Sequence, residues 1–312
     1  MFIDPRHLEQ LAVIVEAGTL QKAATQIGTS QPALSRMLSN LEARIGTPLF
    51  ERSTRPLMPT PTGLELAQQG RSIRAARLRA AEVVDLGARG FFGVLKLGAP
   101  PFLCKNLMSE AIASFLTERS TVRIDLFPDY EVGLMERLYL NQLDVVVGPA
   151  KFVDPMITDL TLEPLFKDKN VIVGRQDHPL LKQSSFNVDD YRAAIWVGHT
   201  DRSTLRADME DSLKLIGIPN PIVACQSESA EAVLQLIRET DFLTVLPQYA
   251  IKPDGSDGLA QATINLPTQD YEVSAITVAD RKETTLISDF KEHLKTQSLT
   301  RYLSGGLGAG AN

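Results

Sequence analysis

Residues 20–46 read LQKAATQIGTSQPALSRMLSNLEARIG, and this stretch decides the fold of the first part of the chain. Apolar side chains recur at helical spacing on both sides of the turn Gly28-Thr29-Ser30. They are Leu20, Ala23, Ala24 and Ile27 before the turn, and Leu34, Leu38, Leu41 and Ile45 after it. Two helices separated by about three residues that include a glycine predict a helix-turn-helix.

The residues before this stretch predict one more helix. Asp4 is a favoured N-cap residue, Pro5 stands at the favoured first position, and Gly18 stands where helices commonly end. Between them, apolar residues recur at helical spacing: Leu8, Leu11, Ala12 and Val15. A unit of three helices is therefore expected at the start of the chain.

The second helix of the motif presents polar side chains on its outward face, namely Gln31, Ser35, Arg36 and Asn40. Arg36 can form a two-pronged contact with a guanine, and Gln31 can do the same with an adenine. Ser35 is short enough to let the helix lie deep in a groove of DNA.

Residues 49–57, LFERSTRPL, follow as two extended pieces around a polar tip and predict a small β-wing. Arg52 and Arg55 stand on this wing. From there an arginine can reach a phosphate or enter a narrow minor groove.

A long helix is expected from Thr62-Gly63 to about Gly87–Gly90. A narrow apolar stripe runs along it, made of Leu66, Ile73, Ala76, Ala80 and Val83. Because one small domain cannot cover so long a stripe, the helix is expected to pair with a second copy of the chain. Three arginines lie beside the stripe, and a solvated face explains them more simply than contacts with DNA: Arg71, Arg74 and Arg77.

From residue 91 on, strands alternate with helices, which is typical of an α/β fold with a parallel sheet. Strands are expected at 94–99, 122–127, 143–147, 171–174, 195–197, 222–224, 243–246 and 271–278, and helices at 105–118, 132–140, 205–215, 230–238 and 286–294. One small sheet does not use this many residues, so two lobes are expected. The cleft between two such lobes is the default place for a ligand.

Composition excludes several classes of protein. The chain has 312 residues, 44% of them hydrophobic, and no apolar run approaches the roughly 20 residues that span a bilayer. Its start lacks the basic segment and apolar core of a secretory signal, so a cytoplasmic protein without membrane contact is expected.

Two cysteines and four scattered histidines suggest neither a disulfide scaffold nor a metal site. Without a nucleophile elbow, a phosphate-binding glycine loop or a zinc-protease motif, neither an enzyme nor a cofactor is expected.

The net charge of −6 hides an asymmetry along the chain. Residues 1–90 carry a balance of +3, whereas residues 91–312 carry −9. Affinity for nucleic acids depends on local basic surface and not on the sum over the whole chain. The balance of the first part therefore fits DNA binding.

The first 65 residues resemble the LysR family of transcriptional regulators through a spaced constellation of motifs. These are Ala23-Ala24, SQPALSR at 30–36, Leu41-Glu42, Ile45-Gly46, LFER at 49–52 and TPTG at 60–63. The later part is similar more loosely, at Asp177-His178-Pro179-Leu180, LDVVV at 143–147 and Val245-Leu246-Pro247. Together the similarity extends over nearly the whole chain.

The resemblance implies a winged helix-turn-helix over 1–61, a linker and dimerisation helix over 62–90, and a sensor like periplasmic binding proteins over 91–312. Lobe I would comprise about 91–166 and 270–303, and lobe II about 167–269. The family forms tetramers assembled from dimers on double-stranded promoter DNA, and a small effector tunes activation or repression. The resemblance names neither the effector nor the promoter, and RNA polymerase is a candidate partner.

The resemblance also assigns sites by matching position. Contacts with DNA are expected from Gln31, Pro32, Ser35, Arg36, Arg52 and Arg55. The effector cleft maps onto Pro100, Phe102, Leu103, Asp129, Gly148, His199, Thr200, Arg202, Ser203, Ser227 and Glu228. Arg202 could clamp an anionic effector, although a salt bridge explains this residue equally well.

Two features leave alternatives open. The family often has Ser or Thr just after the first sensor strand, whereas residues 100–103 here read PPFL, with no hydroxyl and with two prolines that lack N–H donors. A more apolar or differently held ligand is expected, and the alternative is a constitutive DNA-binding regulator whose sensor no longer binds a ligand. Cys104 stands at a predicted helix start, where a thiolate is favoured, but packing explains it better because Cys225 is far away in the sequence.

Overall fold

The computed structural model describes residues 3–51, 57–154, 156–183, 185–200, 203–252, 254–264, 266, 270–279, 281 and 283–305, with side chains described as far as residue 297. The chain forms two compact units. One contains Met1–Phe92 with the segment Tyr139–Gln142, and the other contains Gly93–Leu138 and Leu143–Asn312.

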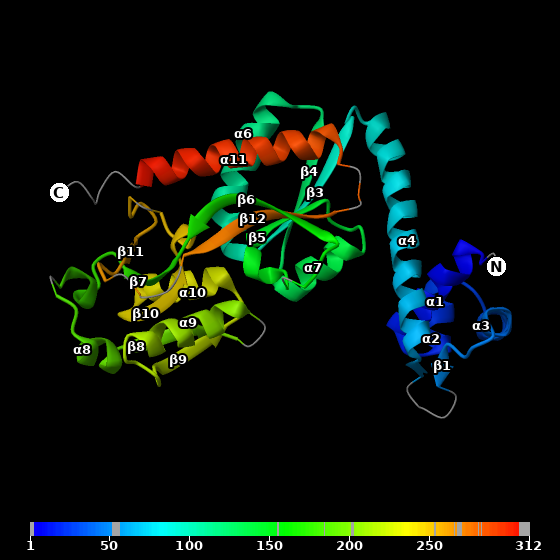
Figure 1. Ribbon diagram of the computed structural model, residues 1–312, viewed down its shortest axis with the longest axis horizontal. Helices are drawn as coiled ribbons and strands as arrows, with labels where there is room; N and C mark the ends of the chain where they lie inside the picture. Colours follow the sequence, from blue (N-terminus) through cyan, green and yellow to red (C-terminus); the bar gives the residue numbers. More distant parts are fainter. Residues whose placement is uncertain are drawn as a thin grey trace. The chain divides into compact units, whose positions relative to one another are not determined.

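The first unit opens with three helices whose ends follow from their flanking residues (Figure 1). They are α1 (Pro5–Ala17), α2 (Leu20–Ile27) and α3 (Gln31–Ile45). At each N-terminus a side-chain oxygen accepts a hydrogen bond from a free amide, and these caps are Asp4, Thr19 and Ser30. After each helix a glycine takes the left-handed conformation that ends it without strain: Gly18, Gly28 and Gly46. The helix-turn-helix predicted from residues 20–46 is therefore present.

A small wing and a long helix complete this unit. Strand β1 (Phe50–Glu51) pairs antiparallel with β2 (Met58–Pro59). Helix α4 follows, from Pro61 to Ala88, and the Oγ1 of Thr60 caps it by accepting a hydrogen bond from the amide of Gly63. The long helix therefore forms where the sequence predicts it, and the wing is present with its second strand just beyond the predicted residues 49–57.

Small residues let α4 approach the rest of its unit closely. Gly63, Ala67 and Gly70 are buried along one face of the helix. A Cβ added to Gly70 would lie 1.9 Å from the carbonyl oxygen of Leu8, and one added to Gly63 would lie 2.1 Å from that of Leu49. The predicted apolar stripe is a different surface, and its later members are exposed within this unit: Ala76, Ala80 and Val83.

The second unit contains two sheets of five strands each, and the order in the first is β4-β3-β5-β12-β6. The strands are β3 (Gly93–Ala99), β4 (Val122–Pro128), β5 (Val145–Pro149), β6 (Leu160–Asp168) and β12 (Tyr271–Val278). Strand β3 runs parallel to β4 and β5, whereas β12 runs antiparallel to β5 and β6. In Figure 1, α6 (Ser109–Glu118) and α11 (Thr285–Gly305) lie on one side of this sheet and α7 (Glu131–Tyr139) on the other.

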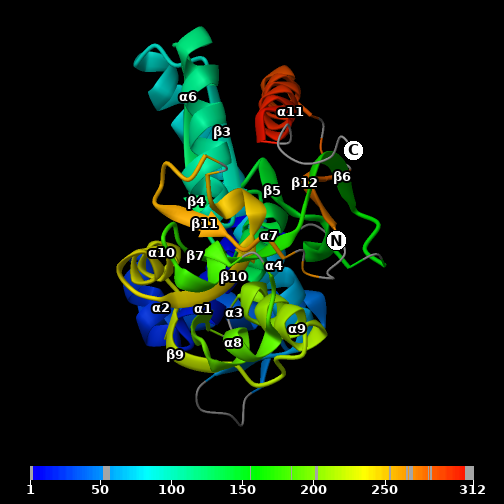
Figure 2. The same ribbon diagram turned by 90° about the vertical axis from the view of Figure 1, so that its left-hand side faces the viewer.

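The order in the second sheet is β11-β7-β10-β8-β9. Its strands are β7 (Asn170–Arg175), β8 (Ile195–His199), β9 (Ile222–Ser227), β10 (Phe242–Pro247) and β11 (Leu259–Gln261). Its helices are α8 (Val188–Ala193), α9 (Thr204–Leu215) and α10 (Ala230–Glu239), seen in Figure 2. Alternate side chains of β7 point to opposite faces of the sheet. Val173 belongs to the same hydrophobic core as Val233 of α10, whereas Ile172 belongs to the core that contains Leu213 of α9. This sheet is therefore covered on both faces.

Short turns link these elements. They are the helical turns α5 (Pro101–Leu103), η1 (Cys104–Met108), η2 (Ala150–Phe152), η3 (Pro179–Lys182) and η4 (Gln248–Ala250). Of these, η1 is a π-helical turn that joins α5 to α6. The helix predicted at 105–118 therefore starts earlier, at Pro101, because the prolines fit its first turn.

Two expectations about the sensor were wrong. The sheets are mixed and not parallel, because β12 in the first sheet and β7 in the second run against their neighbours. Strand β6 was not expected at all, since its apolar pattern is interrupted by Pro164 and the charged Lys167, and its pairing with β12 contains an irregularity. The predicted strand 143–147 begins two residues later, at Val145.

The chain passes between the two sheets at Asp168–Asn170 and again between Gln261 and Tyr271. One core cluster includes residues of both, for example Leu97 of β3 and Val197 of β8. The two lobes therefore pack against one another within this unit. In the described ranges no helix is long and apolar enough to cross a bilayer.

Candidate nucleic-acid interface and effector cleft

The outward face of α3 is the candidate nucleic-acid interface. Gln31, Pro32 and Arg36 are exposed and Ser35 is half-buried, whereas Leu34 lies in the core. A helix that offers a guanidinium and an amide near its N-terminal end can present both to base edges in the major groove. The structure therefore leaves these four predicted contact residues accessible, on the first turns of the second helix of the motif.

Only part of the wing lies within the described residues. Its two strands are present, but the predicted contact residues Arg52 and Arg55 lie outside the described residues. Their roles stay predictions.

Two of the arginines of α4, Arg74 and Arg77, have partners within their own unit. Arg74 donates to both carboxylate oxygens of Glu16, at 2.7 and 3.0 Å, and the Nε of Arg77 donates to Glu9 at 3.1 Å. Both acids belong to α1. These ion pairs join α4 to α1, whereas a solvated face was expected for the arginines, and their contact with DNA stays untested.

The candidate effector cleft lies between the two sheets of the second unit. Four polar contacts between the lobes, called ties from here on, cross it. Lys151 of η2 bonds Asp208 of α9 at 2.5 Å, and the hydroxyl of Tyr130 donates to the carbonyl of Glu228. The remaining two start from the π-turn η1, where Lys105 bonds Glu231 at 2.9 Å and the buried amide of Asn106 donates to the carbonyls of Tyr249 and Ala250, each at 3.3 Å. The lobes are thus closed on one another.

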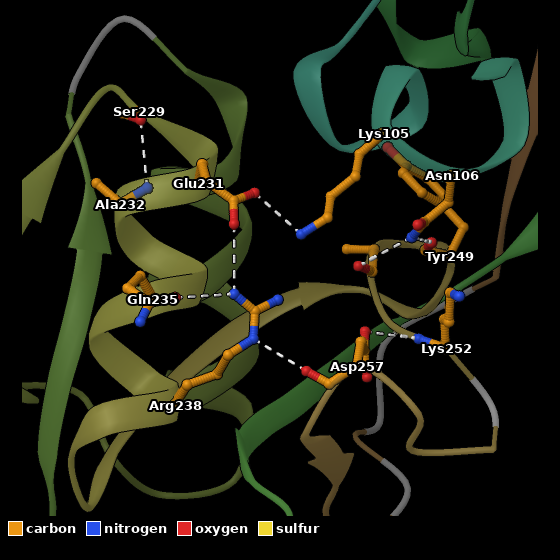
Figure 3. A network of polar contacts seen from close by, with 11 residues as sticks. Lys105, Asn106, Ser229, Glu231, Ala232, Gln235, Arg238, Tyr249, Lys252 and Asp257 are labelled. Atoms are coloured by element: carbon orange, nitrogen blue, oxygen red, sulfur yellow. Dashed lines mark hydrogen bonds and ion pairs between the residues drawn. The ribbon is translucent and has the colours of Figure 1, made fainter.

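The tie at Lys105 belongs to a larger network (Figure 3). Glu231 also pairs with Arg238 at 3.3 Å, and the Nε of Arg238 donates to the carbonyl of Asp257 at 2.9 Å. The hydrogen bond from Lys105 is the largest cause that lowers the pKa of Glu231. Both partners of the inter-lobe pair are partly exposed, so its contribution to stability is small, of the order of 1 kcal/mol or less.

A cavity of about 20 Å³, room for about one water molecule, remains in the cleft. Both lobes and the crossing strands line it. The lining residues are Pro100, Pro101, Phe102, Tyr130, Glu131, Pro149, Phe152, Ser203, Thr204, Leu205, Asp208, Pro247, Tyr249 and Tyr271.

Some predicted effector residues lie at this cavity and others do not. Pro100, Phe102 and Ser203 line it. Gly148 lies directly behind the wall, because a Cβ there would be 2.9 Å from the ring of Phe152. Four of the others are not among the lining residues: Leu103 is core, Asp129 accepts from the amide of Tyr130, Ser227 accepts from the amide of Ser229, and the carbonyl of Glu228 accepts from the hydroxyl of Tyr130. Arg202 lies outside the described residues.

His199 and Thr200 are unusual among the described residues. His199 is fully buried, and neither ring nitrogen has a hydrogen-bond partner there; the same is true of the Oγ1 of Thr200. The imidazole packs edge-on against Phe102, with ring centroids 5.7 Å apart. Burial lowers the pKa of His199 to about 4, so the ring is neutral near pH 7. Unpaired buried polar atoms behind a cavity wall are a feature that a ligand can satisfy.

The ionisable groups around the cavity are mostly acidic. Burial raises the pKa of Glu131, although Lys151 acts in the opposite direction. Burial also raises the pKa of Asp168 to about 7, although its carboxylate accepts the hydroxyl of Tyr271 at 3.1 Å. The ammonium of Lys151 lies 5.3 Å from the centre of the Tyr271 ring.

Sequence reasoning missed most of the polar lining. Glu131, Asp208 and Tyr271 come from segments far apart in the chain, and only the packing of two helices and a crossing strand brings them together. Only Glu131, at the start of α7, had a local signal, since Asp208 lies inside α9 and Tyr271 begins a strand. Among the described residues no cluster of His, Cys, Asp and Glu is fit to hold a metal ion.

Cys104 does not have the surroundings of a reactive thiol. Its Sγ lies 3.3 Å from the carbonyl oxygen of Ala99, and burial raises its pKa to about 12. The thiolate, which is the reactive form, is therefore negligible at neutral pH. Packing accounts for Cys104, as expected.

Two family models match the chain. The "Bacterial regulatory helix-turn-helix protein, lysR family" model matches residues 5–64, and the "LysR substrate binding domain" model matches residues 88–298. The HTH-type transcriptional regulator MetR of Haemophilus influenzae is 25% identical over 96% of both chains. GbpR of Rhizobium radiobacter, a regulator of the same type, is 27% identical over 78% of this chain and 80% of its own. The crystal structure of full-length CbnR complexed with its target DNA has the same fold, with a TM-score of 0.64 and 21% identity over 95% of this chain and 100% of that one.

Proposed function

The chain belongs to the LysR family of bacterial transcriptional regulators, and we propose that a small effector bound between its sensor lobes controls sequence-specific binding to promoter DNA. The exposed polar face of α3, in a chain that also carries a closed two-lobed domain, supports this proposal most strongly.

Recognition of DNA is assigned to the residues at the start of α3. Arg36 and Gln31 would contact base edges, Ser35 and Pro32 would let the helix lie close to the groove floor, and the wing arginines Arg52 and Arg55 would contact the backbone or the minor groove.

The proposed domains are the DNA-binding domain 1–61, the linker and dimerisation helix 62–90 and the sensor 91–312. Exposed apolar side chains on α4, such as Leu78, Val83 and Val84, support its pairing with a second copy. We further propose that such dimers assemble into tetramers and that the DNA-bound assembly contacts RNA polymerase.

Effector control is assigned to the closure of the two lobes. A ligand shifts a conformational equilibrium only by its different affinity for the two states. Here the four polar ties hold the lobes closed, and the cavity between them holds about one water molecule. An effector must therefore change this closure in order to enter, and the changed closure would alter how the assembled copies meet DNA.

Neither of the other functions is favoured. The relatives are transcriptional regulators and not enzymes. A constitutive regulator without a ligand is not favoured either, because the substrate-binding domain of the family is present over 88–298.

Replacement of Arg36 tests the DNA interface. Arg36→Ala is expected to weaken binding to a preferred duplex by about 1–3 kcal/mol, roughly 5- to 150-fold, and to relax the preference at one base pair. Fluorescence anisotropy with a preferred duplex and its single-base variants measures both effects.

Arg74→Ala is the matched control, since Glu16 already holds the guanidinium of Arg74. It should change affinity by less than about twofold and leave the preference unchanged. If Arg36→Ala leaves both the affinity and the base preference unchanged, the assignment of α3 to the DNA interface is wrong.

A further inference from the structure

We propose that the effector carries a cationic nitrogen, as in a primary amine or a guanidinium, which takes the place now held by the ammonium of Lys151 between Asp208, Glu131 and the ring of Tyr271. The inference rests on the proposed function, because it names the class of ligand for the same cleft.

The cavity wall is the first observation that carries it. Among the described lining residues, Glu131 and Asp208 carry the only charges, and both are acids. Glu131 and Asp208 are partly buried, and burial raises the pKa of Glu131. Partly buried carboxylates have a need for a compensating charge or hydrogen bonds. A cation in the cavity would meet it.

Lys151 shows that the site accepts an ammonium group. Its Nζ bonds Asp208 at 2.5 Å and lies 5.3 Å from the centre of the Tyr271 ring, which is within the range of a cation–π contact. The lysine belongs to lobe I and Asp208 to lobe II, so the chain's own cation joins the lobes where a ligand would lie. Lys151 therefore acts as an internal occupant of the site.

Lys151, which contacts the lining residue Asp208, is also the side chain that can leave. The cavity of about 20 Å³ is too small for an effector, so a side chain must move to admit one. Phe102 is almost fully buried, whereas the Lys151 side chain is 38% exposed and has a flexible four-carbon stem. When the ammonium swings into water, it vacates both Asp208 and the Tyr271 ring.

Much of the remaining wall is aromatic, and aromatic faces suit a cation. Five aromatic rings line the cavity: Phe102, Phe152, Tyr130, Tyr249 and Tyr271. At the start of α5, Pro100 provides no side-chain cap, and neither Pro100 nor Pro101 has an N–H to offer an anion. The wall therefore offers negative charge and aromatic faces, with no backbone donors at the start of α5.

The unpaired imidazole of His199 fits the same class of ligand. Its ring contacts Phe102, which lines the cavity, and no described group bonds either nitrogen. A neutral imidazole has one nitrogen that accepts a hydrogen bond. A ligand rich in N–H groups supplies the donor that this nitrogen lacks.

A matched set of four-carbon probes tests the inference on the full chain. Butylamine is cationic, butyrate is anionic and butanol is neutral, and thermal unfolding is followed at constant ionic strength and pH 7. Butylamine is expected to raise the melting temperature in a saturable way, by about 5 °C at high occupancy, and the other two are not. Lys151→Met should increase the apparent affinity for butylamine several-fold, because it removes the internal competitor and leaves Asp208 unpaired.

The controls separate this inference from the proposed function. Asp208→Asn should abolish the response to butylamine, whereas Asp211→Asn, at an exposed position of the same helix, should keep it. If Lys151→Met responds no more to butylamine than to butanol, the cation site is refuted. If butyrate stabilises the chain instead, the sensor does bind a ligand, so effector control stands and the proposed ligand class is wrong.

Discussion

Gly70→Ala is expected to destabilise the N-terminal unit by about 2–3 kcal/mol, although alanine is the better helix former. The added methyl group would lie 1.9 Å from the carbonyl oxygen of Leu8 and 2.5 Å from its carbonyl carbon. Those atoms belong to the backbone of α1, so no side-chain rotation relieves the overlap, and the two helices must separate. Separation also strains the ion pairs of Arg74 and Arg77 with α1.

Circular dichroism at the helical band, during denaturant unfolding, measures this loss. The fluorescence of Trp196, which lies in the other compact unit, reports on the sensor and should change little. Gly87→Ala is the matched control, since a Cβ there meets nothing within 4 Å and should stabilise the same helix by up to about 1 kcal/mol. Equal stabilities of Gly70→Ala and the unchanged chain would show that α1 and α4 do not pack this closely.

The second large effect is a pH dependence caused by Asp168. Its pKa is raised to about 7 in the folded chain by burial, with a smaller contribution from Asp270, whereas an unfolded aspartate titrates near 3.9. Between these values the folded chain holds a proton that the unfolded chain has released. The contribution of Asp168 to the stability of the sensor should therefore fall as the pH rises from about 4 to about 7, by as much as about 4 kcal/mol, and should level off above pH 7. Buried His199 acts in the opposite direction, because its pKa is lowered to about 4 and its contribution to stability rises with pH up to about 6.5.

Asp168→Asn should remove that falling contribution, so the stability of the variant should rise more with pH between about 4 and 7 than that of the unchanged chain, whatever its effect on stability at one pH. The free energy of unfolding is measured across pH 4–8 by denaturant titration of Trp196 fluorescence. Asp211→Asn, at an exposed position, should keep the slope of the unchanged chain. An Asp168→Asn chain with the original slope would mean that Asp168 is ionised throughout this range.

The N-terminal unit could be predicted from sequence because its signals are local. Asp4, Ser30 and the three closing glycines define the helix ends, and the spacing of leucines defines the buried faces. The packing of α4 could not be predicted, since it depends on missing side chains at Gly63 and Gly70, and a search for apolar stripes does not detect those. The π-turn at Cys104–Met108 has no sequence signal either.

The sensor site was predictable only where a residue directly follows a strand or starts a helix. Pro100, Phe102 and Ser203 were assigned by matching position in the LysR family, and they line the cavity. Asp208 lies one helical turn inside α9, and Tyr271 begins a strand that crosses back from the other lobe. Their meeting depends on how the lobes close, which is a property of the tertiary structure and not of any local pattern.

Selection of bound sequences from a random pool of DNA duplexes by the full chain tests the central claim most directly. A regulator that binds as a symmetric dimer through α3 should enrich a motif with two-fold symmetry and half-sites on one face of the duplex. Arg36→Ala should lose information at one position of each half-site. Binding that enriches no motif, or a motif unchanged by Arg36→Ala, would contradict sequence-specific recognition by the helix-turn-helix.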